Sequence, residues 1–223
     1  MSYQPDPDTL RLLGQIPAKL ASATQLPVAQ FELQPKFLAR LQTGEIYMDS
    51  ELQLDTDGWP GGANGDGTHQ SGTSWNYPGG DNPINANEVP YYVLPGGGWD
   101  AQQHVFLGDY AAVIYKTKLV FAVFADRGEP YRMGEGSIQL LRQLSFERIN
   151  QDGSVHNIGT LPGVITIIFP GSGRNKNYPN QAALLTDLAQ NAPPYFQRLG
   201  GQLPVVSATK RRQRRVPKRG STT

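Results

Sequence analysis

Asp126 and Glu135 are the two side chains of this sequence best suited to acid–base chemistry. Asp126 closes an apolar, strand-like run at residues 121–126, which would hold its carboxylate rigidly beside apolar neighbours. Glu135 lies between Gly134 and Gly136, and such glycines would let a ligand approach closely. Two carboxyl groups in different environments can act as acid and base, which is the arrangement that glycoside hydrolysis requires.

Both residues also have simpler structural explanations. Asp126 could cap a turn, and Glu135 could stabilise the first turn of a helix that follows it. Their spacing of nine residues does not fix the distance between them, because an extended chain of that length could span roughly 30 Å. Residue chemistry alone therefore favours the structural explanations slightly over catalysis.

Other kinds of catalytic and metal-binding chemistry find little support. The chain has no cysteine, which excludes disulfides, thiol catalysis and iron–sulfur clusters. His69, His104 and His156 are isolated, so we expect no metal site and no cofactor. The Asp-Thr-Asp-Gly run at 55–58 starts like a calcium-binding loop. A tryptophan and a proline then stand where a third ligand and the loop glycine belong.

Charge is segregated along the chain. Residues 41–115 hold ten acidic side chains and no Lys or Arg, whereas residues 210–219 hold seven cations. Without those seven, thirteen basic residues face nineteen acidic ones, a net charge of −6, although the whole chain carries +1. The acidic stretch could be ordinary solvated surface, but it would also suit a cationic ligand in a cleft.

The elements that must position these side chains are mostly strands. The pattern predicts strands at 44–57, 89–94, 111–116, 119–125 and 164–169, and helices at 137–144 and 180–191. Residues 58–98 are expected to be largely loop, with tryptophans that either anchor the loop or stack on sugars. We expect a helical N-terminal appendage at 1–43, a β-barrel catalytic domain at 44–205 and a disordered basic tail at 206–223.

Short motifs occur in a distinctive order. They lie at residues 48–49, 55–58, 73–75, 89–95, 111–114, 121–126, 133–137 and 167–172. As an ordered set over roughly residues 45–173, they resemble the chitosanases of glycoside hydrolase family 75. The resemblance implies a mainly β fold, a six-stranded double-psi β-barrel with long loops and a few peripheral helices. It also implies that the family's essential Asp and Glu correspond to Asp126 and Glu135.

The implied activity is endo-hydrolysis of the β-1,4 linkages between glucosamine residues of chitosan, with inversion and without a cofactor. Glu135 is expected to be the acid and Asp126 the base. The residues expected to bind sugar are Asp55, Asp57, Trp75, Tyr91 and Asp109. Chitosan is a cationic polysaccharide, which matches the acidic stretch. Neither nucleic acid nor a membrane is expected as a partner, and we expect a monomer.

The sequence departs from the family's fungal members, because it lacks cysteine and shows no signal peptide. An extracellular location is still expected from the resemblance. Two alternatives remain open: a non-catalytic polysaccharide-binding double-psi barrel, which needs no second carboxylate, and a peptidoglycan-cleaving relative. The acidic stretch disfavours the more anionic wall polymers as substrates.

Overall fold

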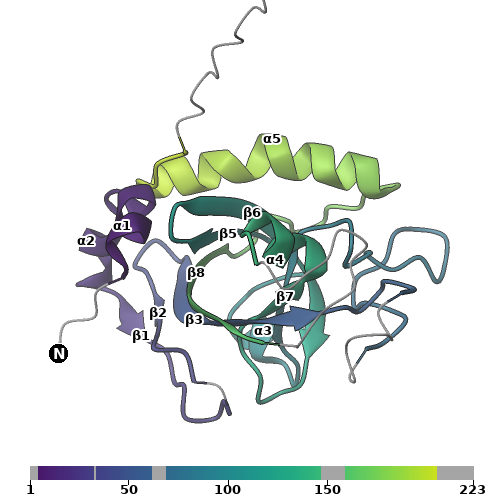
Figure 1. Ribbon diagram of the computed structural model, residues 1–223, viewed down its shortest axis with the longest axis horizontal. Coiled ribbons are helices and arrows are strands. Elements are labelled where there is room, and N and C mark those ends of the chain that lie inside the picture. Colours follow the sequence, from purple (N-terminus) through teal and green to yellow (C-terminus); the bar gives the residue numbers. More distant parts are fainter. Residues whose placement is uncertain (1–4, 33, 62–68, 147–158, 205–223) are drawn as a thin grey trace, which may run out of the picture.

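Six strands of the chain close into a β-barrel in the computed structural model, which describes residues 5–32, 34–61, 69–146 and 159–204 (Figure 1). Around the barrel they follow the order β3 (Ile46–Asp55), β7 (Glu135–Ser137), β4 (Tyr91–Pro95), β6 (Lys118–Gly128), β5 (Tyr110–Tyr115) and β8 (Leu161–Phe169). The barrel closes because β8 also pairs antiparallel with β3. The mainly β, six-stranded expectation is therefore confirmed, whereas the double-psi connectivity stays a prediction.

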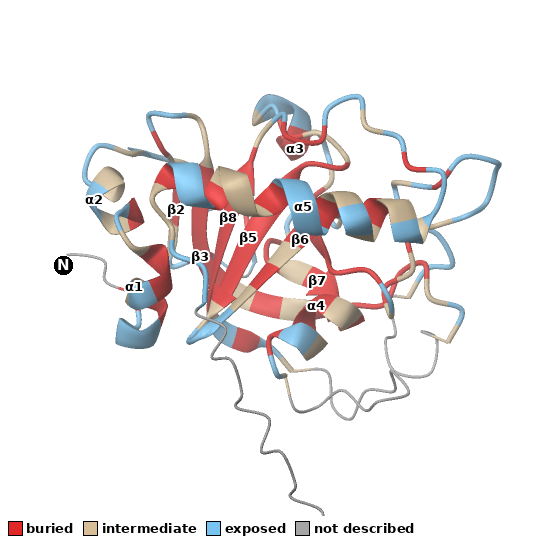
Figure 2. Cartoon of the chain, turned by 90° about the horizontal axis from the view of Figure 1, so that it is seen from above, coloured by how far each residue is buried: buried red, intermediate tan, exposed pale blue. Residues whose placement is uncertain are grey.

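The strands are buried along most of their length (Figure 2). Runs such as 111–114 and 164–169 are apolar without polar alternation, which is typical of strands covered on both faces. One cover is helix α5 (Gln181–Leu199), which contacts β5 and β6. The buried side chains of α5 recur about every four residues and form one stripe: Leu184, Leu188, Ala192, Phe196 and Leu199.

Helix α5 runs further than the sequence predicts. The prediction stops at residue 191 because Pro193 and Pro194 each lack the backbone N–H of a helical hydrogen bond. The structure continues the helix to Leu199. Phe196 is fully buried and meets the ring of Phe121 on β6 edge-on, with ring centroids 6.2 Å apart. Tertiary packing of the last turn thus overrides the local preference of the two prolines.

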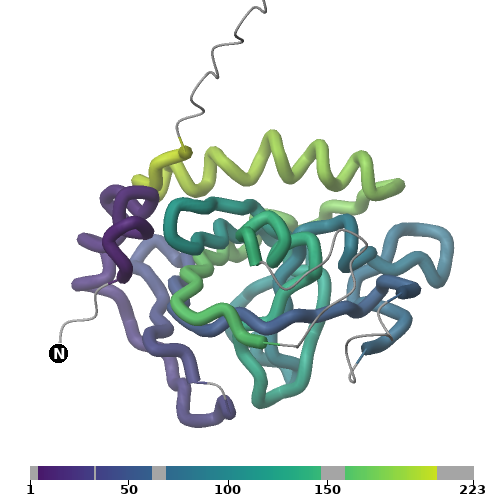
Figure 3. The backbone as a smooth tube through the Cα atoms, in the orientation of Figure 1, coloured from purple at the N-terminus to yellow at the C-terminus, as the bar shows by residue number. Residues whose placement is uncertain are grey.

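The N-terminal segment is only partly helical. Helices α1 (Pro7–Leu13) and α2 (Ile16–Leu20) are followed by strands β1 (Thr24–Gln25) and β2 (Phe37–Arg40), which the helical expectation for 1–43 did not include. β2 pairs antiparallel with β3, so this segment extends the barrel sheet. Helix α1 also lies at the C-terminal end of α5 (Figure 3), where the Gln202 N–H donates to the Leu12 carbonyl at 2.8 Å.

The remaining elements follow the sequence more closely. β4 and helix α4 (Ile138–Gln143) fall where they were expected, and the Ser137 hydroxyl caps α4. The short strand β7 and helix α3 (Trp99–Gln102) were not expected. The basic tail at 206–223 lies outside the described residues. In the part of the chain that the structure describes, no helix has both the length and the apolar character of a membrane span.

Candidate active site

Strand β4 sets the positions of Asp126 and Glu135. Val93 of β4 pairs with Asp126 on β6 on one side and with Glu135 on β7 on the other. Residues that pair across neighbouring strands point to the same face of a sheet. The two carboxylates therefore flank Val93 on one face, and both line the same pocket. Sequence spacing did not fix the distance between Asp126 and Glu135. Strand pairing does, because it places the two residues on either side of Val93.

A β-bulge aims Asp126 into this pocket. Tyr92 pairs with Phe124 and Val93 pairs with Asp126, so Ala125 is the extra residue of β6. The Ala125 carbonyl accepts a hydrogen bond from the Trp75 N–H at 2.9 Å. The bulge thus provides a carbonyl to which the long loop before β4 is hydrogen-bonded. It also interrupts the regular alternation of side chains along β6 just before Asp126.

Asp126 is held through one of its two carboxylate oxygens. Its Oδ1 accepts hydrogen bonds from the Ser74 N–H and the Ser74 hydroxyl, both at 2.7 Å, and from the Arg127 N–H at 2.8 Å. The side chain is buried, and Oδ2 accepts no hydrogen bond from the described residues. An oxygen that receives three donors is bound as an ionised carboxylate would be, and the second oxygen is left for a ligand or a water molecule.

The glycines beside Glu135 serve the barrel and not a ligand, contrary to the sequence-based expectation. Gly134 has a φ of +90°, and a Cβ there would collide with the Glu51 carbonyl oxygen. A Cβ on Gly136 would lie 2.7 Å from Leu140 and 3.2 Å from the Tyr91 carbonyl oxygen. Both glycines therefore let β7 approach its neighbours closely, which fixes Glu135 at the start of this strand.

The Glu135 carboxylate lies close to Arg132 and Gly128, two other residues that line the pocket. Its Oε1 is 3.5 Å from the Arg132 guanidinium, and its Oε2 lies where a Cβ on Gly128 would stand. The pocket has about 140 Å³ of space that water can enter, enough for several water molecules. Its lining residues are Leu54, Asp55, Asp57, Gln70, Asp126, Arg127, Gly128, Glu129, Arg132 and Glu135.

Asp55 and Asp57, which the sequence predicts to bind sugar, line the same pocket as Asp126 and Glu135. Asp55, Asp57 and Asp126 each present a carboxylate oxygen within 4.8 Å of the others. Burial, and then the charge of Asp57, raise the pKa of Asp55 well above its usual value, although the Asp57 N–H donates to Asp55 at 2.7 Å. Such a cluster could hold a cation, either a metal ion or the ammonium group of a substrate.

Tyr91 and Trp75 lie beside the pocket without lining it. Tyr91 is fully buried, and its hydroxyl donates to the Asp57 carbonyl at 3.0 Å. Burial and the nearby aspartates raise the pKa of Tyr91. Trp75 packs edge-on against Tyr178, with ring centroids 5.7 Å apart. Tyr91 therefore forms the floor beneath the acidic cluster, and Trp75 anchors its loop, which is the structural alternative for this tryptophan.

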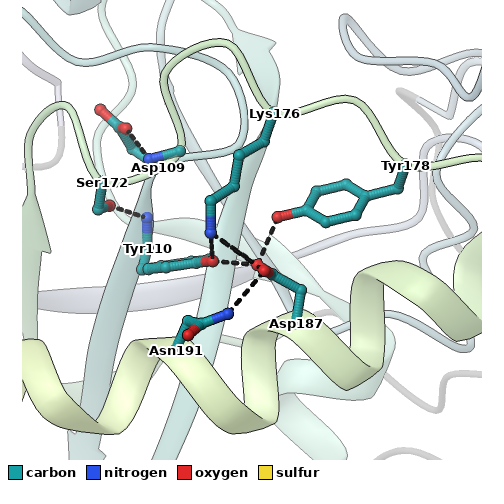
Figure 4. Close-up of polar contacts among 8 residues, drawn as sticks. Asp109, Tyr110, Ser172, Lys176, Tyr178, Asp187 and Asn191 are labelled. Carbon is teal, nitrogen blue, oxygen red and sulfur yellow. Dashed lines mark hydrogen bonds and ion pairs between the residues drawn. The ribbon is translucent and has the colours of Figure 1, made fainter.

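The structure does not bring Asp109 to the pocket. Its buried carboxylate accepts hydrogen bonds from the backbone N–H groups of Phe106, Gly171 and Gly173 at 2.7–2.8 Å. Burial raises the pKa of Asp109, and these three hydrogen bonds oppose the rise. The side chain ties the start of β5 to the loop after β8, next to the Ser172 hydroxyl that accepts from the Tyr110 N–H (Figure 4).

Sequence reasoning missed three residues of the site. Ser74 holds Asp126, Arg132 faces Glu135, and the Gln70 N–H donates to the Asp57 carboxylate at 2.6 Å. Ser74 belongs to the recognised Thr-Ser-Trp motif at 73–75, so a motif did mark it, although its role did not follow from the sequence. No sequence pattern marks Gln70, which a loop thirteen residues beyond Asp57 brings to the pocket, or Arg132, which stands just before the recognised motif at 133–137 and three residues from Glu135.

The chain matches the model of a known protein family. A family model described as the fungal chitosanase of glycosyl hydrolase group 75 matches residues 52–203. This range includes both pocket carboxylates that flank Val93 and the whole of the acidic cluster. A comparison with curated proteins finds no match.

Proposed function

Because the chain belongs to the fungal chitosanase family of glycosyl hydrolase group 75, we propose that it cleaves internal β-1,4 bonds between glucosamine residues of chitosan with inversion. The family membership supports glycoside hydrolysis and chitosan as the substrate. The endo action, the linkage and the stereochemistry are the proposal.

The observation that carries the proposal is the pairing of Val93 with both Asp126 and Glu135. Two strand spacings separate the backbones of the two acidic residues by about 9.5 Å. Inverting glycosidases hold their carboxyl groups roughly 6.5–9.5 Å apart to admit a water molecule, whereas retaining enzymes need roughly 5–5.5 Å. A backbone separation of two strand spacings leaves room for a water molecule between the two carboxyl groups, which is what inversion requires.

Asp126 is proposed as the base and Glu135 as the acid. With Oδ1 of Asp126 engaged by three donors, Oδ2 would accept a proton from a water molecule as that water attacks the anomeric carbon. Glu135 would give its proton to the glycosidic oxygen as the bond to the leaving sugar breaks. The new reducing end then carries the inverted configuration, and the proton from water resides on Asp126.

The charge of the pocket supports a cationic substrate. Five carboxyl groups line it and face two arginines, of which Arg127 already pairs with Asp100 through Nε at 2.8 Å and Nη2 at 2.7 Å. Asp55 and Asp57 are proposed to face the ammonium groups of bound glucosamine units. We also propose that the protein works outside the cell as a monomer, in keeping with a family of fungal chitosanases.

Two isosteric variants test the proposal. Asp126→Asn and Glu135→Gln should each abolish the release of reducing sugar from soluble chitosan, because each removes one proton-transfer group and keeps its shape. Asp81→Asn, which changes an exposed aspartate outside the pocket, is the matched control and should keep full activity. Near-full activity in either pocket variant, with an unchanged melting temperature, would overturn the assignment.

A further inference from the structure

A second pocket adjoins the acidic one. It has about 320 Å³ of space that water can enter, within the range of pockets that bind small ligands. The loop after β3, the loop before β4 and the start of α5 form its walls. Its lining residues are Gly58, Pro60, Tyr77, Asn82, Pro83, Asn85, Asn180 and Gln181, and we call it the amide pocket.

The two pockets share a wall. Asp57 lines the acidic pocket and Gly58, the next residue, lines the amide pocket. The Gly58 N–H also donates to the carbonyl of Gln70, another residue of the acidic pocket, at 3.1 Å. Consecutive Cα atoms are about 3.8 Å apart, so a single residue step separates the two sites. One polymer chain could therefore occupy both.

The chemistry of the amide pocket differs from that of its neighbour. Four side-chain amides line it, and no carboxylate, lysine or arginine does. The Asn85 Oδ1 accepts from the Asn87 N–H at 2.9 Å, and the Asn180 Oδ1 accepts from the Ala183 N–H at 3.0 Å. These bonds fix the carbonyl ends of both amides. Among the described residues neither NH₂ group has a partner, so both are available as donors.

We propose that the amide pocket is a carbohydrate subsite for a neutral, N-acetylated glucosamine unit of a chain whose free glucosamine units occupy the acidic pocket. This inference rests on the proposed function for the identity of the polymer. An acetamido carbonyl can accept hydrogen bonds from the amide NH₂ groups, and the rings of Tyr77, Pro60 and Pro83 offer apolar surface to a sugar. An ammonium group would lose hydration there without gaining a carboxylate.

Asn85→Asp is the sharpest test. The variant keeps the acceptor for the Asn87 N–H, but it replaces the NH₂ donor with a carboxylate oxygen. Gln102→Glu adds the same charge at an exposed position outside both pockets and is the control. Binding of the N-acetylglucosamine trimer and of the glucosamine trimer is measured by calorimetry. Loss of one neutral hydrogen bond predicts about tenfold weaker binding of the neutral trimer to Asn85→Asp.

Gln181→Ala provides a second variant if Asn85→Asp fails to fold, and it should also weaken binding of the neutral trimer. The proposal fails if the wild-type protein does not bind the neutral trimer, or if folded variants of the amide pocket bind it as the control does. Hydrolysis of chitosan by the wild-type protein is measured in parallel. Hydrolysis without binding of the neutral trimer refutes only the subsite. Binding that Asn85→Asp weakens, without hydrolysis, supports the pocket and refutes the proposed function.

Discussion

Ser74 is the residue on which the geometry of the proposed base depends most. It is exposed, yet its hydroxyl and its N–H both donate to the Asp126 Oδ1, and the hydroxyl also accepts from the Arg127 N–H at 3.1 Å. A side chain this exposed adds little to the core. Its hydrogen bonds instead fix Oδ1 and leave Oδ2 without a donor from the described residues, which makes Ser74 a positioning residue.

Ser74→Ala should lower kcat roughly 10- to 100-fold, because a hydrogen bond to a charged group contributes about 1.5–3 kcal/mol. KM should change little, since Ser74 is not expected to touch the sugar, and Ser74→Thr should keep most of the activity. Steady-state kinetics on soluble chitosan measure both constants. Ser172→Ala is the control, because that buried hydroxyl also accepts a backbone hydrogen bond but lies outside the pocket. Equal kcat losses in the two alanine variants would contradict a positioning role.

Asp55 makes the stability of the protein depend on pH. Burial and the charge of Asp57 raise the folded-state pKa of Asp55, so the folded protein binds this proton more tightly than the unfolded chain does. The free energy of unfolding therefore falls as pH rises from the unfolded pKa of about 3.9 through the raised folded pKa.

Asp55→Asn should remove this penalty, because its side-chain oxygen can still accept from the Asp57 N–H. We expect a higher melting temperature than that of the wild-type protein at pH 7, and a difference that disappears below about pH 4. Thermal unfolding followed by circular dichroism across this pH range measures the effect. A variant that is less stable than the wild-type protein at pH 7 would show that the Asp55 charge is stabilising.

At the scale of elements, α5 packs on the barrel through its apolar stripe and is also hydrogen-bonded to it through a polar cluster. The Asp187 carboxylate of α5 accepts hydrogen bonds from the Tyr110 hydroxyl of β5, the Tyr178 hydroxyl, the Lys176 ammonium and the Asn191 amide (Figure 4). Burial raises the pKa of Asp187, but these four donors outweigh it and lower the pKa to about 2. Tyr178 also packs on Trp75, so the same cluster supports the loop that carries Ser74.

Asp187→Asn should lower the free energy of unfolding at pH 7 by roughly 1 kcal/mol, less than the full equivalent of the shift in pKa, because solvent screens this partly exposed carboxylate. Because the folded pKa is depressed, the wild-type protein has this contribution above about pH 4 and loses it as pH falls towards 2. Urea unfolding at pH 7 and at pH 2.5 measures both values. A variant as stable as the wild-type protein at pH 7 would contradict this account of the helix attachment.

The sequence predicts elements better than it predicts contacts. The apolar runs of β5, β6 and β8 can be recognised because an uninterrupted apolar run reflects burial on both faces of a strand, and the stripe of α5 because its period reflects burial of one helix face. β7 is three residues long, too short for any period, and its place beside β3 depends on Gly134. Residue chemistry identifies Asp126 and Glu135 as candidates. The bulge and the shared partner Val93 bring them together, and both depend on strand register, which the sequence does not reveal.

At the scale of the whole molecule, the basic C-terminal stretch and the rest of the chain carry net charges of opposite sign. The net charge of −6 outside residues 210–219 suits a cationic polymer, whereas the seven cations of the tail do not contribute to this match. Net charge alone does not identify the residues that bind substrate. Asp109 belongs to the acidic stretch, yet its carboxylate accepts hydrogen bonds from three backbone N–H groups. Only the acidic residues that fold into the pocket can act on the substrate.

A variant without residues 208–223 should hydrolyse chitosan as the full chain does, because both proposed proton-transfer groups and the acidic cluster lie within residues 55–135. In both proteins KM should rise as salt is increased from about 10 mM to about 150 mM, since the Debye length shrinks from about 30 Å to about 8 Å. Initial rates at several chitosan concentrations measure this. A large loss of activity on deletion would assign the tail a part in catalysis, and a KM insensitive to salt would contradict electrostatic attraction of the substrate.

Asp126 and Glu135, placed two strands apart across Val93, are proposed to cleave chitosan with inversion at the anomeric carbon. Proton NMR of the first oligomers released, recorded before mutarotation, tests it most directly. We expect new reducing ends that are initially α-anomers, since the β-1,4 bond is cleaved with inversion. Reducing ends that first appear as β-anomers, or no new reducing ends at all, would contradict it.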